Sequence, residues 1–400
     1  MSTERLNFAD PYLRAFAARV IARADRDGRP AVALDRTAFY PEGGGQPADH
    51  GTLDGARVVD VQSDDAGLVW HVLDRRVERD DVEGEVDWPR RFDHMQQHHG
   101  QHLLSAAFEE LFGLATLAFH LGAEYSSIDL PGEVPEDRIE AAERRANEVI
   151  WEDRPVVTRI VMPEELATIP LRKPPVVEGP VRIVSVPDFD HSACGGTHPR
   201  STGAVGLLHV SRRERRGAET RVEFLCGGRA LEDLRRKTRL VSRLSTDLSV
   251  GAGELEETVQ RIKHHEAATR KRLADNLERL LRYEALELIA WAPRAGNVPL
   301  VHTIRDDLSL ADGRVLANAI VAAGGVAVIG LRGDKAQLLV AAPAAAGVDC
   351  NAVVRTALEP VGGRGGGQPA MAQGGVPDSA LLEAAVIRAV ELLTSAIRKS

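Results

Sequence analysis

The chain has 400 residues and a formal net charge of −9, with 44% hydrophobic and 27% charged residues. A single hydrophobic core rarely grows to this length, so we expect two or three globular domains. No run of about 18 apolar residues is present, which excludes a membrane-spanning helix. Three cysteines without a CxxC pair exclude a disulfide framework. Together with a charged N-terminal stretch unlike a secretory signal, they favour a cytoplasmic protein.

Residues 1–92 are expected to form the first domain, a β-barrel. Segments 31–40 and 56–62 are rich in β-branched and aromatic residues and are bounded by Gly, Asp and Pro, as strands are. Between them, residues 41–51 read PEGGGQPADHG. Three consecutive glycines allow positive φ and close approach of the backbone, so we expect an irregular loop here.

The second expected domain, residues 93–228, mixes helices and strands. Asp93 is expected to cap a long helix that buries a stripe of apolar side chains and stops at Gly113. A further helix is expected at 136–150, with a charged, exposed face. The other regular segments are expected to be strands at 157–162, 181–186, 204–210 and 221–226.

Residues 229–292 are expected to form a helical arm. Segments 229–248 and 254–291 carry spaced leucines and almost no glycine, and the sequence VGAG separates them. Two antiparallel helices, as a hairpin or coiled coil, fit this pattern.

The last expected domain, residues 293–400, is a small α/β unit, because strand-like and helix-like segments alternate along it. Its expected strands are 298–304, 326–332 and 336–343, and its expected helices are 310–323, 350–360 and 379–400. A second glycine cluster occupies 362–375.

Two separated pairs of histidine and cysteine residues suggest a metal site. His98 and His102 lie four apart on the expected helix, so both side chains project from one face. Cys194 and His198 have the same spacing in the segment CGGTH, whose glycines allow the loop to turn both side chains to one point. Nitrogen and sulfur donors together are the set that zinc prefers.

Spacing alone leaves the ligand set open. His94 lies four residues before His98, and His99 also lies within this stretch. A zinc protease of the HExxH type is excluded, because no glutamate lies between His98 and His102.

Three motifs resemble the editing domain of alanyl-tRNA synthetases and, more closely, the free-standing alanyl-tRNA editing proteins of the AlaX type in their long form. They are FYPEGGGQPADHGTL at 39–53, QQHHGQHLLS at 96–105 and SACGGTH at 192–198. Residues 229–291 and the C-terminal unit are similar to the helical linker and the DHH-associated domain of the synthetases. The resemblance covers nearly the whole chain and is compatible with an α+β fold.

The resemblance implies that one zinc ion is bound by His98, His102, Cys194 and His198. His99 stands where the editing proteins more often carry threonine. It lies between the two helical ligands and off their face, so we expect it to leave metal binding unaffected.

The resemblance also implies candidate catalytic and substrate-binding residues. Gln101 precedes the second helical ligand and is expected to contact substrate. Segment 118–130 resembles the strands of the editing pocket, which places His120 and Asp129 near the site. The loop residues Gly43, Gly44, Gly45 and Gln46 are candidates to shape the pocket, with a plain barrel turn as the alternative.

The implied activity is trans-editing, the hydrolysis of the ester that joins a wrong amino acid to tRNA(Ala). A pocket that hydrogen-bonds the serine hydroxyl leaves buried groups unpaired when alanine enters. Accepting glycine while rejecting alanine rests on sterics alone, worth about 1–3 kcal/mol. Ser-tRNA(Ala) is therefore the expected substrate, with Gly-tRNA(Ala) second.

Contact with tRNA is expected through phosphates, despite the negative net charge. One basic cluster consists of Arg212, Arg213, Arg215 and Arg216, and a second consists of Arg235, Arg236 and Lys237. The first cluster lies closer in sequence to CGGTH. The alternative is that each cluster is only a solvent-exposed charged surface without a binding role. A homodimer through the helical arm or the C-terminal domain is also compatible with the sequence.

Two other functions were weighed against deacylation. Four protein ligands form a closed, structural type of zinc site, so a non-catalytic tRNA-binding protein is the alternative function. A DHH-type phosphoesterase is disfavoured, because the chain contains no DHH triplet.

Overall fold

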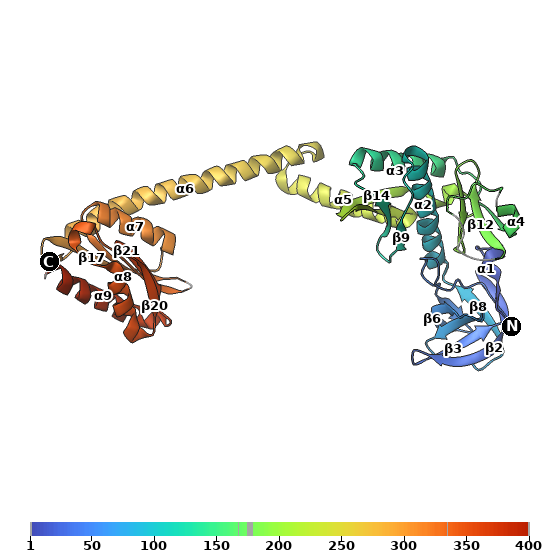
Figure 1. The fold of residues 1–400 in the computed structure, drawn as a ribbon, viewed down its shortest axis with the longest axis horizontal. Coiled ribbons are helices and arrows are strands. Elements are labelled where there is room, and N and C mark those ends of the chain that lie inside the picture. Colours follow the sequence, from blue (N-terminus) through green and yellow to red (C-terminus); the bar gives the residue numbers. More distant parts are fainter. Residues whose placement is uncertain (1, 167, 174–178, 334, 399–400) are drawn as a thin grey trace. The chain divides into compact units, whose positions relative to one another are not determined.

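The computed structural model describes residues 2–166, 168–173, 179–333 and 335–398 (Figure 1). The chain divides into two compact units, Met1–Leu244 and Ser245–Ser400, and each is described by itself. Within the described residues, no helix combines the length and apolar character needed to cross a bilayer.

The first unit begins with a closed six-stranded barrel, as the sequence predicts. Phe39 and the strand residues Leu34, Leu53 and Leu73 are fully buried in its core. Segment 31–40 is a strand only in part, because the chain turns away after Leu34. In barrel order the strands are β2 (Ala15–Arg26), β3 (Arg29–Leu34), β7 (Val69–Leu73), β6 (Ala56–Ser63), β5 (Gly51–Leu53) and β8 (Asp81–Val86). Beside them lie β1 (Glu4–Arg5), α1 (Leu6–Ala9) and β4 (Arg36–Thr37).

Helix α2 (Trp88–Phe112) connects the barrel to the next layer of the first unit. The helix begins earlier than expected, so the expected N-cap at Asp93 is wrong. Asp87 is the cap, since its side chain accepts a hydrogen bond from the backbone N–H of Arg90, and Pro89 occupies the first turn. The expected stop at Gly113 is confirmed, with a left-handed φ of 66°.

Helix α2 packs on a four-stranded antiparallel sheet in the order β14-β15-β10-β9. Leu104 and Phe108 of the helix meet Ile128 and Phe224 of the sheet in a fully buried core. A side chain at Gly100 is impossible here, because an added Cβ would lie 2.2 Å from the sulfur of Cys226. The strands are β9 (Ala118–Leu121), β10 (Ser126–Pro131), β14 (Leu208–Arg216) and β15 (Glu219–Cys226).

The rest of this layer covers the core and carries the CGGTH loop. The expected strand at 204–210 is wrong in its first half, where η1 (Thr202–Val205) occupies the segment before β14. Helix α3 (Glu136–Trp151) covers the same core as α2. A three-stranded sheet is formed by β11 (Val157–Val161), β12 (Val181–Val186) and β13 (Asp190–Ala193), with α4 (Pro163–Leu166) after β11.

The two helices expected for the arm are present as α5 (Gly227–Leu248) and α6 (Leu255–Trp291), joined through η2 (Ala252–Glu254). Their antiparallel pairing stays a prediction, since the division between the two units falls within α5.

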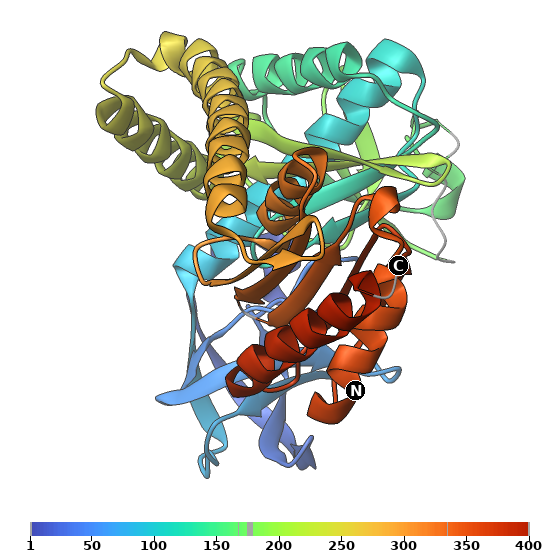
Figure 2. The ribbon, with the colours of Figure 1, turned by 90° about the vertical axis from the view of Figure 1, so that its left-hand side faces the viewer.

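The second unit is a six-stranded sheet with helices on both faces (Figure 2). Its strand order is β16 (Arg294–Ala295), β17 (Val298–Arg305), β18 (Val326–Arg332), β19 (Ala336–Ala341), β21 (Met371–Gly375) and β20 (Arg364–Gln368). One core is formed with the C-terminal end of α6 and with α7 (Leu310–Ala322). The other core is formed with α8 (Cys350–Leu358) and α9 (Leu382–Ile397). Short 3-10 turns are η3 (Ala344–Ala346), η4 (Glu359–Val361) and η5 (Ser379–Leu381).

The second glycine cluster forms the hairpin β20–β21, which the sequence did not indicate because glycine is depleted in strands. An added Cβ at Gly367 would lie 2.6 Å from the backbone of the facing strand, so the pairing itself needs glycine. The last two residues of the helix expected at 379–400 lie outside the described residues.

One buried ion pair joins the barrel to helix α2. The side chains of Arg91 on the helix and Asp49 in the glycine-rich segment are both 0% exposed. Arg91 Nε donates to both carboxylate oxygens of Asp49, at 3.0 and 2.9 Å. The same guanidinium donates to the carbonyls of Pro11 and Ala38, at 2.8 and 2.6 Å. Every one of these acceptors belongs to the N-terminal segment, so the pair anchors the barrel on α2.

Replacing Asp49 with alanine leaves the buried guanidinium of Arg91 without its carboxylate. We expect the free energy of unfolding to fall by about 3–5 kcal/mol, measured by urea denaturation. Asp80→Ala is the control, because it removes an ion pair with Arg23 whose side chains are 42% and 63% exposed and which is worth about 0–1 kcal/mol. Equal losses for the two variants would contradict this.

Candidate metal centre

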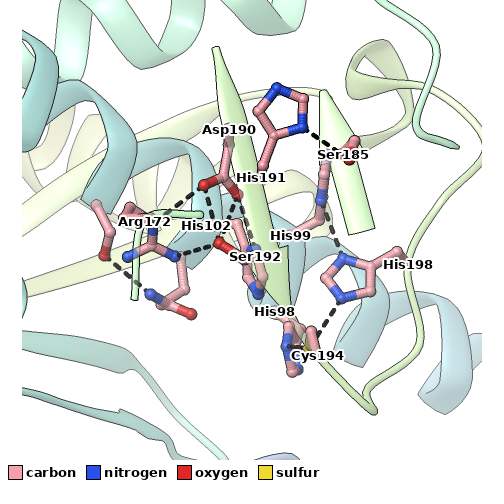
Figure 3. A network of polar contacts seen from close by, with 12 residues as sticks. His98, His99, His102, Arg172, Ser185, Asp190, His191, Ser192, Cys194 and His198 are labelled. Atoms are coloured by element: carbon pink, nitrogen blue, oxygen red, sulfur yellow. Dashed lines mark hydrogen bonds and ion pairs between the residues drawn. The ribbon is translucent and has the colours of Figure 1, made fainter. Parts of the chain in front are cut away.

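Four donors from the two predicted pairs converge at one point. The ligand atoms of His98, His102, Cys194 and His198 all lie within 4.8 Å of one another. Cys194 Sγ is 3.1 Å from His98 Nε2 and 3.3 Å from His198 Nε2 (Figure 3). The structure thus selects among the histidines that spacing left open, and His94 is not in the group.

This donor set fits a tetrahedral metal. Three imidazoles and one thiolate match the ligands of zinc, at bond lengths of about 2.0–2.1 Å to nitrogen and about 2.3 Å to sulfur. Donors around such an ion are separated by roughly 3.3–3.8 Å. The side chains of this chain therefore need only small shifts to hold the ion.

The loop that carries Cys194 and His198 comes unusually close to α2. An added Cβ at Gly196 would lie 2.4 Å from Cε1 of His98, so only glycine fits between the loop and the helix. The buried Arg182 of β12 holds the loop from its other side, donating to the carbonyls of Cys194 and Gly196, both at 2.8 Å. The sequence did not single out Arg182, which looked like any polar strand residue.

Electrostatics in the cluster favour a thiolate. Burial raises the pKa of the Cys194 thiol, but the neighbouring His98 imidazole and hydrogen bonds from His102 and His198 outweigh it and hold that pKa well below its usual value. Burial lowers the pKa of His198 to about 3, which keeps its imidazole neutral and ready to bind a metal. His102 differs, since hydrogen bonding to Asp190 and Cys194 overcomes burial and raises its pKa to about 9.

Asp190 orients His102. Its Oδ2 lies 3.0 Å from His102 Nδ1, which leaves His102 Nε2 facing the other donors (Figure 3). Arg172 Nε donates to Asp190 Oδ1 at 3.0 Å, and the hydroxyl of Ser192 donates to the same carboxylate. Sequence analysis missed Asp190 and Arg172, although the position of Asp190 four residues before Cys194 was visible.

His99 contacts His198, the fourth candidate ligand, although it lies off the face of α2 that carries His98 and His102. Its Nδ1 lies 3.0 Å from Nδ1 of His198, and its side chain is fully buried. The expectation considered helix α2 alone, on which His99 is turned away from His98. The contact is made from outside the helix, by the loop that brings His198 to this side.

Two residues of the glycine-rich loop, Gln46 and Gly45, make contacts next to the candidate metal centre. Gln46 is fully buried, donates to the hydroxyl of Thr197 at 2.8 Å and accepts from the Thr197 backbone N–H at 3.0 Å. Gly45 has a φ of +77°, and an added Cβ there would lie 2.5 Å from the ring of Phe119. That ring lies 6.3 Å from the His98 ring, so the loop lies beside the metal donors.

The three candidate catalytic residues are placed differently. Gln101 is buried on α2 and donates to the Ser105 hydroxyl at 2.8 Å. His120 and Asp129 lie on the face of the sheet opposite Phe119, because side chains alternate along β9 and β10. Asp129 there accepts two hydrogen bonds from Arg221, both at 2.6 Å. The structure does not bring His120 and Asp129 to the metal donors.

The predicted basic cluster lies on the β14–β15 hairpin, and each arginine has a carboxylate nearby. Arg213 and Arg215 share Glu133, at 3.3 and 3.4 Å. Arg216 pairs with Glu214 at 3.3 Å and Arg212 with Glu223 at 4.0 Å. The exposed pairs among them, Arg215–Glu133 and Arg216–Glu214, are worth about 0–1 kcal/mol each.

Two family models match parts of the chain. The threonyl and alanyl tRNA synthetase second additional domain matches residues 181–222, and the DHHA1 domain matches residues 297–399. The first match contains Cys194 and His198, and the second covers the C-terminal sheet unit.

Sequence similarity to individual proteins covers nearly the full chain. The alanyl-tRNA editing protein AlaX-L of Pyrococcus horikoshii is 30% identical over 93% of this chain and 94% of its own length. The alanyl-tRNA editing protein Aarsd1 of Danio rerio is 34% identical over 58% of this chain and 59% of its own length. The alanine–tRNA ligase of Pyrococcus abyssi is 30% identical, and the chain spans only 44% of that protein.

Replacing Asp190 with asparagine removes the carboxylate that orients His102. Loss of such a partner weakens metal binding by about 10–100-fold, so we expect that loss in zinc affinity, measured by competition with a chromophoric chelator. The matched control is Asp188→Asn two residues away, at an exposed turn with a φ of 58° that asparagine tolerates. Equal zinc affinities for the two variants would refute the role of Asp190.

Proposed function

The chain belongs to the family of alanyl-tRNA editing proteins, and from this premise we propose that it is a trans-editing deacylase. The reaction is hydrolysis of the ester between a wrongly attached amino acid and the terminal ribose of tRNA(Ala). The observation that carries the proposal is the identity to AlaX-L over 93% of this chain and 94% of that protein, which is more than a shared module. The four converging donors support it with a defined metal centre.

The proposed hydrolysis requires little catalytic assistance from the protein. An aminoacyl ester is already activated, so a positioned water and a stabilised oxyanion suffice. When bound by His98, His102, Cys194 and His198, zinc would supply a fixed positive charge, and since four protein donors close its tetrahedral set, we assign that charge to orienting the tRNA end. Gln101, one position before His102 on α2, is the proposed polar contact to the substrate.

We assign the recognition of the amino acid to the glycine-rich loop. Gly43 and Gln46 bond to each other through both backbone groups, at 3.2 and 3.0 Å, and Gln46 is held by Thr197. These bonds fix the turn, while Gly44 and Gly45 at its tip carry no side chain to block a substrate. A pocket that hydrogen-bonds the serine hydroxyl would favour serine over alanine, because alanine leaves the groups of the pocket unpaired.

A second candidate function has one observation in its favour. Four protein donors are typical of a structural zinc site, whereas catalytic sites keep a position open. A non-catalytic tRNA-binding protein would use the same donors only to hold the CGGTH loop.

Contact with tRNA phosphates is proposed for the hairpin arginines Arg212, Arg213, Arg215 and Arg216. A second cationic feature begins two residues after His198 in the sequence, where the Arg200 guanidinium lies 4.4 Å from the centre of the Tyr12 ring. The ring centroids of Tyr12 and Trp88 are 5.1 Å apart. The Arg14 guanidinium lies 4.3 Å from the centroid of the Trp88 ring. Alternating guanidinium groups and aromatic rings suit single-stranded RNA.

We expect the zinc-loaded protein to release serine from Ser-tRNA(Ala), glycine more slowly, and alanine least. Release of labelled amino acid measures all three rates. Treatment with a chelator should abolish release and added zinc should restore it, because the donors lose their fixed geometry without the ion. Tight tRNA binding without release of any amino acid would instead establish the non-catalytic function, and faster release of glycine would overturn the preference for serine.

The double variant Arg215→Gln/Arg216→Gln should weaken tRNA binding and lower the slope of log affinity against log salt by about 1–2 units. Arg14→Gln/Arg200→Gln tests the second feature in the same way. The control is Arg270→Gln/Arg282→Gln on α6, where both arginines also face carboxylates. A hairpin variant whose salt slope equals that of the control would remove the hairpin from the RNA surface.

A further inference from the structure

We propose that His99 is a positioning residue for the metal centre: it holds Nδ1 of His198 and thereby directs Nε2 of His198 to the ion. The inference rests on the four-donor centre, and it stands whether or not the chain hydrolyses tRNA.

The two nitrogens of His198 face different partners. Nδ1 is 3.0 Å from Nδ1 of His99, and Nε2 is 3.3 Å from Sγ of Cys194 (Figure 3). The rings of His99 and His198 stand almost perpendicular, at 87°, with centroids 5.2 Å apart. His99 thus meets His198 at the nitrogen that does not face the other donors.

Hydrogen bonding decides which tautomer this contact permits. Two Nδ1 atoms can bond only if one of them carries a proton. If His99 donates, a neutral His198 must keep its own proton on Nε2, which closes that atom to a metal. If His198 Nδ1–H donates to His99, the lone pair of His198 Nε2 is free to bind the ion. Only the second arrangement is compatible with the donor set.

The burial of His99 points to this contact as its role. Nε2 of His99 is buried and has no hydrogen-bond partner among the described residues. An unpaired buried polar group costs about 1–3 kcal/mol, a cost that an apolar ring of similar size would avoid. The bond to His198 is the compensation that an apolar ring could not provide.

The other histidine ligands support the same geometry. His102 also presents Nε2 to the donors, with its Nδ1 held by Asp190 at 3.0 Å. Nδ1 of His98 has no partner among the described residues, and Gly196 packs against its ring instead. His102 and His198 are therefore each held at Nδ1 by a neighbouring side chain, and His99 is the residue that holds His198.

The test compares two replacements of His99 with a matched control. His99→Phe keeps a ring and removes both nitrogens, whereas His99→Asn offers an amide oxygen near the position of Nδ1. The control is His94→Phe, one turn earlier on α2, because His94 is also buried, has an unpartnered Nδ1 and lies outside the donor set. Zinc affinity is measured by chelator competition, and cobalt is used to record the thiolate-to-metal absorption band.

We expect His99→Phe to weaken zinc binding by about 10–100-fold and to shift the cobalt spectrum. His99→Asn should recover most of the affinity, and His94→Phe should bind zinc within about twofold of the unaltered protein. The inference is overturned if His99→Phe binds zinc as tightly as His94→Phe, or if His99→Asn loses as much affinity as His99→Phe.

A spectroscopic readout separates positioning from folding. In the zinc-loaded protein, ¹⁵N shifts of the imidazoles should show His198 with a proton on Nδ1 and His99 with its proton on Nε2. Metal coordination through Nδ1 of His198 would overturn the inference. Neither measurement depends on deacylation, so failure of the proposed activity would leave this result standing.

Discussion

The close approach of the CGGTH loop to helix α2 is the constraint on which the centre depends. Gly196 lies against the ring of His98, where a Cβ would come within 2.4 Å of a ring carbon. Because no side chain separates the two segments, Cys194 Sγ reaches 3.1 Å from His98 Nε2. Donors from two distant parts of the chain can share one ion only at such distances. A larger residue at this position would push the loop away and separate the pairs.

Further hydrogen bonds hold this concentration of polar groups at several of its members. Asp190 and His99 contact two of the imidazole ligands, and Arg182 holds the loop carbonyls. These hydrogen bonds offset part of the cost of burying polar groups. The same bonds that stabilise the fold therefore also restrict the direction of each donor.

The barrel belongs to this arrangement, although its core is separate. Gln46 of its glycine-rich loop bonds to Thr197, next to His198, and Asp49 of the same segment pairs with Arg91 on α2. Both contacts join the N-terminal strands to elements that carry metal donors. The C-terminal sheet has its own cores on its two faces and needs neither contact.

The amino-acid sequence by itself determined the local features of this protein. Apolar periodicity located α2, strand-like composition located β6, β12 and β18 among others, and i,i+4 spacing together with a family resemblance identified the donors that converge. Local patterns did not indicate the start of α2 after Asp87 or the hairpin β20–β21 in a glycine-rich segment.

Only the tertiary structure decided the surroundings of the donors. Arg172 and Arg182 carry no spacing that marks them, and His99 looked remote because a helix turned it away from His98. Their contacts arise when the β12–β13 sheet and its loop pack against α2. Hydrogen bonds act over about 3 Å, so which residues make them follows from packing and not from distance along the chain.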